Sequence, residues 1–381
     1  MILCDDWLNV PETQAVCDAL AALGFQALFV GGCVRNALLG VAVSDIDIAT
    51  DATPEEIMNC AREADLKAIP TGIEHGTITI VSGEIAHEIT TFRSDIETDG
   101  RHAKVRFSKD VNQDAARRDF TLNALYADKD GNVLDPLNGL RDLKARRVRF
   151  IGDAHARIKE DYLRSLRFFR FTAWYGDPNL GIDADGLAAV ASNLEGIENL
   201  SRERVGSESK KLLEAPNPSS AVAAMRSSGL LATVLDAADD KALALLVHFE
   251  QEMNIAPDPI RRLSALAGAE NAKRLRLSKA DAKKWAILRE EAGSVKSAAH
   301  LGYLYDAEIA SDILLLRAAL LEMPLPKEQF LEAVKGDQIE FPVRAKDLPN
   351  LTGRELGERL KALEQRWITS EFTLTRAELL S

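Results

Sequence analysis

Two carboxylates with room for a metal ion beside them are the side chains of this sequence best suited to chemistry. Asp45 and Asp47 occupy alternate positions of a strand-like run, Ser44 to Thr50. Alternate strand residues point to one face, so the carboxylates would lie about 5–7 Å apart and repel each other without a cation. Ile46 and Ile48 would face the core. We expect the pair to hold two Mg²⁺ ions, one activating an attacking hydroxyl and the other neutralising a triphosphate and its leaving pyrophosphate.

A glycine pair, Gly31-Gly32, precedes these carboxylates. The apolar residues Ala27 to Val30 predict a buried strand that ends at the glycines, and Val34 to Leu39 predict the start of a helix. Backbone N–H groups freed at the turn, together with the Arg35 side chain, would point at an anion. Gly-Gly pairs are also common in loops, so an ordinary turn stays open as the alternative.

Two further segments carry candidate site residues. Glu88 lies in a strand-like run of alternating polarity, so it is either a third catalytic carboxylate or a surface acid. In the octapeptide Arg117 to Ala124, Arg118 could grip phosphates, while Asp119 and Asn123 could hydrogen-bond a ribose. The alternative for the octapeptide is an ordinary helix start with paired arginines.

The elements that must position these groups divide the chain in two. Up to about Val133, short strand-like runs alternate with turns, and one helix is expected from Pro54, with Thr53 as its N-cap. The polar stretch from Ser94 to Gln113 is expected to be a mobile loop over the site. After about Ile158 the sequence predicts helix upon helix. The fold class is therefore α+β.

A basic segment runs from Arg141 to Arg170, where ten Lys or Arg against four Asp or Glu give a net charge of +6. Most charge runs are solvated helix faces. Aromatic and aliphatic residues interleave with these arginines, however, so we expect some of them near the core, each with a partner.

Composition narrows the class of protein. The chain has 381 residues, enough for more than one domain, and a formal net charge of −12, which argues against indiscriminate nucleic-acid binding. Four cysteines without paired spacing, Cys4, Cys17, Cys33 and Cys60, indicate buried thiols rather than zinc or disulfides. No apolar run reaches the length of a membrane span, and the start, Met1 to Asp6, is acidic rather than basic. We expect a cytoplasmic enzyme.

The set of motifs resembles the class II tRNA nucleotidyltransferases, or CCA-adding enzymes, and the related bacterial poly(A) polymerases. The matching segments follow the family's order and are Gly31-Gly32-Cys33-Val34-Arg35 with Asp45-Ile46-Asp47, Arg117 to Ala124, Gly139-Leu140-Arg141-Asp142-Leu143, Glu160-Asp161-Tyr162-Leu163-Arg164 and Ser201-Arg202-Glu203-Arg204-Val205 with Glu208. Asn36 stands where the family commonly has Asp. The resemblance implies a nucleotidyltransferase head with a polymerase β-like mixed sheet at 1–140, a helical neck for nucleobase selection at 141–225, and a helical body and tail for tRNA binding at 226–381.

By the same resemblance, the fourth segment reads the incoming base. Asp161 and Arg164 are three residues apart and would neighbour each other on a helix. The carboxylate would accept from the exocyclic amine of cytosine or adenine, and the guanidinium would donate to the ring acceptor beside it. Uracil and guanine present a carbonyl instead and would be rejected. Glu160 is expected to orient Arg164, and Arg167 and Arg170 to reach the nucleotide.

Two shorter matches favour the CCA-adding enzymes over the related poly(A) polymerases. Pro70-Thr71-Gly72-Ile73-Glu74-His75-Gly76-Thr77 resembles a run of CCA-adding enzymes, and the Asp99-Gly100-Arg101 segment resembles the flexible element that full CCA addition needs. The expected function is template-independent addition of C, C and A to the 3′ end of tRNA from CTP and ATP. A poly(A) polymerase or an A-adding enzyme is the alternative, and a non-catalytic RNA-binding scaffold is a remote one because both metal carboxylates are present. The oligomeric state stays open.

Overall fold

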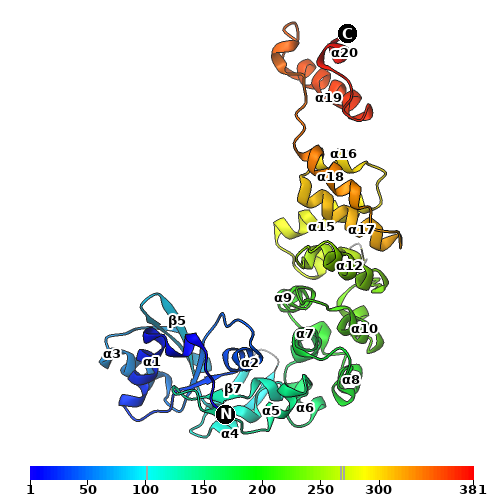
Figure 1. Cartoon of the computed structure of the whole chain (residues 1–381). Coiled ribbons are helices and arrows are strands. Elements are labelled where there is room, and N and C mark those ends of the chain that lie inside the picture. Colours follow the sequence, from blue (N-terminus) through cyan, green and yellow to red (C-terminus); the bar gives the residue numbers. More distant parts are fainter. Residues whose placement is uncertain (100–101, 267, 269–270) are drawn as a thin grey trace. The chain divides into compact units, whose positions relative to one another are not determined.

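The computed structural model describes residues 1–99, 102–266, 268 and 271–381. The chain forms two compact units, Met1–Leu235 and Asp236–Ser381, each with a hydrophobic cluster of its own. Every strand in the described residues lies in the first unit, and the second unit is helical (Figure 1). The expected α+β fold, with strands first and helices afterwards, is confirmed.

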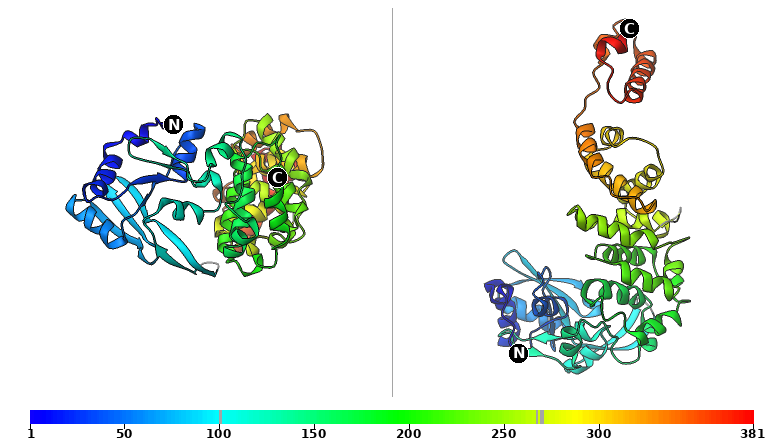
Figure 2. Two further views of the ribbon diagram at one scale, coloured as in Figure 1. Left: turned by 90° about the horizontal axis from the view of Figure 1, so that it is seen from below. Right: turned by 45° about the vertical axis from the view of Figure 1, so that its right-hand side comes forward.

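The first unit is built on a mixed sheet of seven strands in the order β3-β4-β5-β2-β1-β8-β9, with a separate hairpin, β6-β7. The strands are β1 (Leu28–Val30), β2 (Asp47–Thr50), β3 (Lys67–Gly72), β4 (Thr77–Ser82), β5 (Ile85–Thr91), β6 (Arg93–Asp99), β7 (His102–Phe107), β8 (Tyr126–Ala127) and β9 (Val133–Leu134). Strand β2 is parallel to β5, and the other neighbours are antiparallel. Helices α1 (Pro11–Ala22) and α3 (Pro54–Glu63) pack against each other and against β4 and β5 (Figure 2). The strand that carries Asp47 is therefore central to the sheet.

Local signals explain where these elements begin and end. Helix α3 starts with a capping box, in which Thr53 Oγ1 accepts from Glu56 N and the Glu56 carboxylate accepts from Thr53 N. Helix α2 (Gly32–Leu39) follows β1 directly and ends at Gly40, whose φ of +66° suits glycine. The strand expected before the glycine pair and the helix expected from Pro54 are confirmed.

The strand predicted for Ser44 to Thr50 is shorter than expected. It begins only at Asp47, so Asp45 lies in the segment that leads into β2. Ile48 is buried, whereas Ile46 is only half-buried. Strand alternation therefore fixes the face to which Asp47 points, but not the direction of Asp45. Residues before the first strand pair need not follow the alternating pattern of the strand.

The prediction of a mobile loop from Ser94 to Gln113 is wrong. Most of the stretch forms the β6-β7 hairpin, followed by the start of α4 (Val111–Ala116). Cross-strand pairing satisfies the backbone of a polar strand as well as that of an apolar one, so polarity alone did not reveal these strands. Gly100 and Arg101, part of the flexible element expected from the resemblance, lie outside the described residues.

Helices complete the first unit. They are η1 (Asp6–Asn9), η2 (Ile73–His75), η3 (Thr121–Asn123), α5 (Gly139–Lys144), α6 (Ala154–Glu160), α7 (Leu163–Tyr175), α8 (Ala184–Ala191), η4 (Ile197–Asn199), α9 (Arg202–Leu213), α10 (Ser219–Ser227) and α11 (Leu230–Val234). Phe120 and Phe150 form an isolated β-bridge, and the Phe150 ring stacks on Phe168 of α7 with centroids 5.3 Å apart. This aromatic contact attaches α7 to the segment that follows the sheet.

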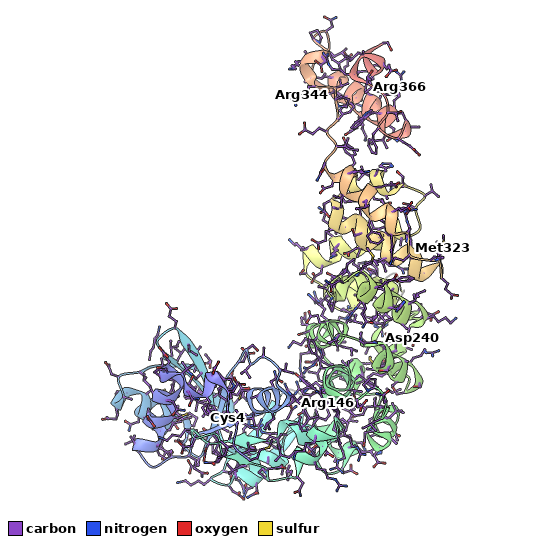
Figure 3. All side chains as sticks on the ribbon, in the orientation of Figure 1. Cys4, Arg146, Asp240, Met323, Arg344 and Arg366 are labelled. Carbon is purple, nitrogen blue, oxygen red and sulfur yellow. The ribbon has the colours of Figure 1, made fainter. Side chains whose placement is uncertain are left out.

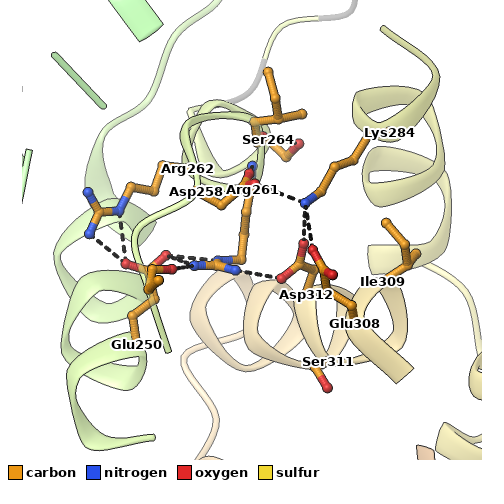
Figure 4. Close-up of polar contacts among 12 residues, drawn as sticks. Glu250, Asp258, Arg261, Arg262, Ser264, Lys284, Glu308, Ile309, Ser311 and Asp312 are labelled. Carbon is orange, nitrogen blue, oxygen red and sulfur yellow. Dashed lines mark hydrogen bonds and ion pairs between the residues drawn. The ribbon is translucent and has the colours of Figure 1, made fainter. Parts of the chain in front are cut away.

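The second unit contains a buried network of charges. Its helices are α12 (Lys241–Glu252), α13 (Pro259–Ala265), α14 (Asn271–Arg274), α15 (Lys279–Ala292), α16 (Ala298–Leu304), α17 (Ala307–Leu320), α18 (Lys327–Asp337), η5 (Ala345–Asp347), α19 (Gly353–Thr369) and α20 (Arg376–Leu380). Glu250 pairs with both Arg261 and Arg262, and Asp312 pairs with Arg261 and Lys284 (Figure 4). Each of these charges has an opposite partner, which is the condition for burying it.

Three of the four cysteines are buried, as expected, but Cys4 is exposed. The chain is extended there, and Ile2 pairs with Asn132. Leu3 points inward, so its neighbour Cys4 points outward. Among the described residues, no helix has both the length and the apolar character needed to cross a membrane.

Candidate functional site

The expected metal-binding carboxylates gather at the start of β2 and on β5. Asp47 is paired in register with Glu88. His87 is fully buried, and its Nε2 lies 3.0 Å from Oγ1 of Thr13 on α1. Because neighbouring strand residues point to opposite faces of a sheet, Glu88 points away from α1. Asp45 precedes the strand and is exposed. The strand pairing thus brings Asp47 and Glu88 to one face, and the chain brings Asp45 close to them.

Asp47 shows the effect of this crowding. Burial raises the pKa of its carboxyl to about 6, with the charges of Glu88 and Asp45 adding to the rise and Arg118 opposing it. The described residues contain no group of three or more His, Cys, Asp or Glu side chains already arranged around a metal position. Two crowded oxygen ligands fit a divalent cation whose remaining ligands are water and substrate, which is the usual coordination of Mg²⁺.

The glycine pair forms the turn between β1 and α2. Gly31 has a φ of +70°, a conformation in which other residues are strained. A Cβ at Gly31 would lie 3.5 Å from Arg118 Nη1 and 3.6 Å from the Asn123 carbonyl oxygen. The turn therefore packs its backbone against two residues of the octapeptide, so two separate candidate motifs meet here.

Arg35 is a buried cation whose hydrogen-bond partners in the described residues are all neutral. Its side chain is 6% exposed. Nη1 donates to Asn123 Oδ1 at 2.5 Å, Nη2 to the Tyr175 hydroxyl at 2.8 Å, and Nε to Asn36 Oδ1 at 3.1 Å. Burial lowers the pKa of Arg35. A positive charge held by neutral groups stays available to an anion at the glycine turn.

Arg118 is held by Asp114, a residue that the sequence analysis did not single out. Asp114 accepts from Arg117 Nε at 2.8 Å, from Arg118 Nη2 at 2.9 Å and from the Tyr126 hydroxyl at 2.8 Å. Burial alone would raise the pKa of Asp114, but the two arginines and Tyr126 outweigh it and lower that pKa to about 2. The arginines follow the end of α4 instead of starting a helix, and their spacing of three and four residues from Asp114 was the available signal.

Asp119 joins the octapeptide to α7. Asp119 Oδ1 accepts from Asn123 Nδ2 at 2.9 Å, and Oδ2 accepts from Arg167 Nε at 2.7 Å. Burial raises the pKa of Asp119, but Arg167 and Asn123 outweigh this and lower it. Arg170, one turn further on α7, pairs instead with Glu208 of α9 at 2.6 Å. Arg167 therefore lies within the octapeptide's network, whereas Arg170 is engaged by a carboxylate from α9.

The prediction that Asp161 and Arg164 share one helix is wrong. Asp161 is extended, with φ −151° and ψ 106°, and separates α6 from α7. Its Oδ1 accepts from Leu163 N at 3.1 Å, so the carboxylate binds the free N-terminus of α7 and favours a helix break. Its Oδ2 pairs with Arg204 of α9 at 2.6 Å, while Arg164 pairs with Glu160 at 2.5 Å. The two candidate base-reading side chains are thus each held by a different partner.

Comparison with known families identifies two matching segments. Residues 27–149 match the family described as "Poly A polymerase head domain", and residues 179–241 match "Probable RNA and SrmB- binding site of polymerase A". The first match contains the carboxylates, the glycine turn and the octapeptide.

Curated relatives and solved structures match over longer stretches. The chain is 32% identical over 379 residues to CCA tRNA nucleotidyltransferase 1, mitochondrial, of Danio rerio, covering 94% of this chain and 86% of the relative. It is 39% identical over 239 residues to the CCA-adding enzyme of Levilactobacillus brevis, covering 61% of this chain and 58% of that one. The fold matches the crystal structure of the Bacillus stearothermophilus CCA-adding enzyme in complex with CTP with a TM-score of 0.73 and 25% identity, covering 95% of this chain and 94% of that one.

Proposed function

This chain belongs to the CCA tRNA nucleotidyltransferase family, and we propose that it adds C, C and A to the 3′ end of tRNA from CTP and ATP, releasing pyrophosphate. The observation that carries the proposal is the ion pair between Arg167 and Asp119, 2.5 Å between Nη2 and Oδ2. It fastens α7, whose first turn bears Arg164, to the octapeptide beside the glycine turn. A group suited to reading a base thereby lies in the same network as groups suited to binding a triphosphate.

Nucleotidyl transfer of the polymerase type generally uses divalent metal ions. We propose that Asp45 and Asp47 hold Mg²⁺ and that Glu88 is a further catalytic carboxylate beside them, a choice supported by the raised pKa of Asp47. When bound, the ions neutralise triphosphate charge and lower the pKa of the attacking hydroxyl.

We propose the remaining roles from the family resemblance, with the contacts as support. The triphosphate binds at the Gly31-Gly32 turn, with Arg35 and Arg118. Both guanidinium groups lie beside this turn, so their N–H groups and those of the turn can donate to one anion. Asp119 and Asn123 hydrogen-bond the ribose.

Base selection is proposed for Asp161 and Arg164, with Glu160 orienting Arg164. Arg204 occupies one oxygen of Asp161 and fixes the direction of the carboxylate. Arg167 reaches the nucleotide through its place beside Asp119. Arg170 is paired with Glu208 of α9, so its proposed contact with the nucleotide requires this pair to open.

The larger divisions of the chain stay proposals. We propose a catalytic head at 1–140, a base-selecting neck at 141–225, and a body and tail at 226–381 that bind tRNA. A cytoplasmic location is likewise proposed, although the relatives from Danio rerio and Mus musculus are named as mitochondrial.

Three RNA substrates test the proposed activity. We would incubate the protein and Mg²⁺ with tRNA transcripts that lack CCA, end in C or end in CC, adding each nucleoside triphosphate singly and then together. We expect CTP to extend the first two transcripts, ATP to extend the third by one residue, and CTP with ATP to stop after three residues. An unlimited A ladder would identify a poly(A) polymerase, and extension of the CC-ended transcript alone would identify an A-adding enzyme.

The Asp45→Ala variant separates an enzyme from an RNA-binding scaffold. We expect it to lose incorporation while its affinity for tRNA stays near that of the wild type. Incorporation that survives the substitution would contradict the proposed metal-binding residues.

A further inference from the structure

The ten cations of the basic segment Arg141 to Arg170 divide into two groups. Five are engaged by carboxylates, in the pairs Arg149–Asp142, Arg157–Glu160, Arg164–Glu160, Arg167–Asp119 and Arg170–Glu208. The other five are exposed: Lys159 lies on α6, and Arg141, Lys144, Arg146 and Arg147 lie within seven residues of one another. Within the part of the chain that the structure describes, these four side chains form no hydrogen bond or ion pair. The proposed chemistry of the site leaves this second group unexplained.

Arg141 and Lys144 lie in the last turn of α5, and Arg146 and Arg147 lie in the hydrogen-bonded turn that follows it. Arg146 N donates to Leu143 O at 3.0 Å, Arg147 N to Asp142 O at 2.9 Å, and Asp177 N to Arg146 O at 3.0 Å. Arg146, labelled in Figure 3, has a φ of +51°, an uncommon conformation for a residue other than glycine. Because the backbone of this turn is already fixed, binding of a partner here would cost little conformational entropy.

Three carboxylates close to this turn have partners other than the four cations. Asp142 is 3% exposed and is paired with Arg149. Asp177 accepts from a backbone N–H in the turn after α7, and Asp183 accepts from one at the start of α8. The positive charge of the four exposed side chains is thus not neutralised by a salt bridge.

A recess lies at the base of the turn. Arg146 and Arg147 line it together with Gly176, Gly181 and Asp183, and its volume is about 300 Å³. The recess therefore holds two cations and one carboxylate, and that carboxylate accepts from Gly186 N. A phosphodiester group in the recess would lie beside both guanidinium groups. The other two cations, Arg141 and Lys144, lie one helical turn apart on α5 and extend the charge beyond the recess.

We propose that Arg141, Lys144, Arg146 and Arg147 form a docking surface for the sugar-phosphate backbone of the RNA substrate, separate from the site that takes the nucleoside triphosphate. This inference rests on the proposed function. Four cations spread over the end of α5 and the turn after it suit successive phosphates of a polyanion better than one small anion. In a chain with a net charge of −12, such a local cluster also orients an approaching RNA.

Salt-dependent RNA binding tests this surface. We would compare Arg146→Gln/Arg147→Gln with a control, Arg62→Gln/Lys67→Gln, which removes two exposed cations on α3 and β3. Fluorescence anisotropy with a tRNA transcript lacking CCA would be measured from 50 to 200 mM salt. We expect the first variant to bind roughly tenfold more weakly at low salt and to lose about 1–2 from the slope of log K against log salt. The control should match the wild type, and thermal unfolding would verify that both variants are folded.

The same variants separate this inference from the proposed activity. With saturating tRNA, we expect the kcat and the KM for CTP of Arg146→Gln/Arg147→Gln to stay near the wild-type values. If this variant binds tRNA with the affinity and the salt dependence of the wild type, the proposed docking surface is wrong, whatever its activity. If inorganic tripolyphosphate displaces the RNA from the wild type but not from the variant, the recess is a small-anion site and the proposal is wrong. If the wild type binds RNA through this surface but extends no transcript, the surface stands and the proposed function fails.

Discussion

Arg35 lies against Tyr175, with Cζ 4.1 Å from the ring centroid and Nη2 donating to the hydroxyl at 2.8 Å. Arg35 follows the glycine turn, whereas Tyr175 ends α7, the helix that begins beside Asp161. The contact therefore links the proposed triphosphate-binding group to the proposed base-reading helix. Tyr175 acts through Arg35, so it is a positioning residue.

Replacing Tyr175 should weaken nucleotide binding without stopping the chemistry. Tyr175→Phe removes a hydrogen bond to a charged donor, worth about 1.5–3 kcal/mol, and Tyr175→Leu also removes the cation–π contact. We expect the KM for CTP and ATP to rise roughly tenfold in Tyr175→Leu and less in Tyr175→Phe, with kcat nearly unchanged. Steady-state kinetics would measure both constants. A wild-type KM in Tyr175→Leu would show that Arg35 does not depend on this ring.

Asp114 should make the first unit sensitive to acid. Its pKa lies at about 2 in the folded protein, below the ordinary aspartate value of 3.8, so its contribution is present above pH 3.8 and is lost as the pH falls towards 2. Asp114→Asn leaves Arg117 and Arg118 without their carboxylate, and we expect the free energy of unfolding to drop by about 3 kcal/mol at neutral pH. Urea unfolding from pH 2 to 7 would measure this loss and a flatter acid dependence.

Asp18→Asn is the matched control, because Asp18 pairs with Lys129 in an exposed ion pair. A stability loss as large as that of Asp114→Asn would show that burial of the carboxylate is not the cause.

Asp47 should oppose folding when no metal is present. Burial and the neighbouring Glu88 raise its pKa to about 6, so the charged form destabilises the fold above the pKa of the unfolded chain. We expect Asp47→Asn to raise the unfolding free energy of the metal-free protein by on the order of 1 kcal/mol, and its Tm accordingly. The same substitution should abolish nucleotide incorporation.

Mg²⁺ should raise the Tm of the wild type but not that of Asp47→Asn, because bound metal stabilises only a protein that holds it. Chelation should stop incorporation, and added Mg²⁺ should restore it. Equal stabilisation of both proteins by Mg²⁺ would exclude Asp47 as a ligand.

The ion pair between Arg204 and Asp161 should control nucleotide choice. Asp161→Ala removes the acceptor for the exocyclic amine, and Arg204→Gln frees the carboxylate to turn away. We expect both variants to lose roughly tenfold or more in the preference for CTP over UTP, measured as the ratio of kcat/KM values. Arg204→Lys should recover part of the preference. Unchanged rejection of UTP in Asp161→Ala would refute its proposed role.

Glu250 should be essential to the stability of the second unit. It accepts from Arg261 and Arg262, and all three side chains are at most 3% exposed. Glu250→Gln leaves two buried cations without this carboxylate, and we expect a loss of about 3–5 kcal/mol. Glu358→Gln, which breaks the exposed Arg354 pair, should change stability by less than about 0.5 kcal/mol. Similar unfolding curves for the two variants would contradict the prediction.

Sequence reasoning was strongest where the signal is local. The strand before Gly31, the capped helix after Thr53 and the helical second half follow from hydrophobic period and capping residues. It was weakest where contact with another segment of the chain decides the conformation. The polar residues from Ser94 onwards form a hairpin because another strand pairs with them, and Asp161 leaves the helix because its carboxylate binds the next helix start.

Motif spacing was enough to identify the residues that could carry nucleotide transfer, since the spacing is local and side-chain chemistry does not depend on the fold. Which carboxylate each arginine meets depends instead on tertiary packing. Arg167 pairs with Asp119 and Arg170 with Glu208, although both arginines lie on one helix and have the same chemistry. Those pairings depend on how α7 packs against the octapeptide and α9, and long-range packing selects one arrangement among many that the local sequence allows.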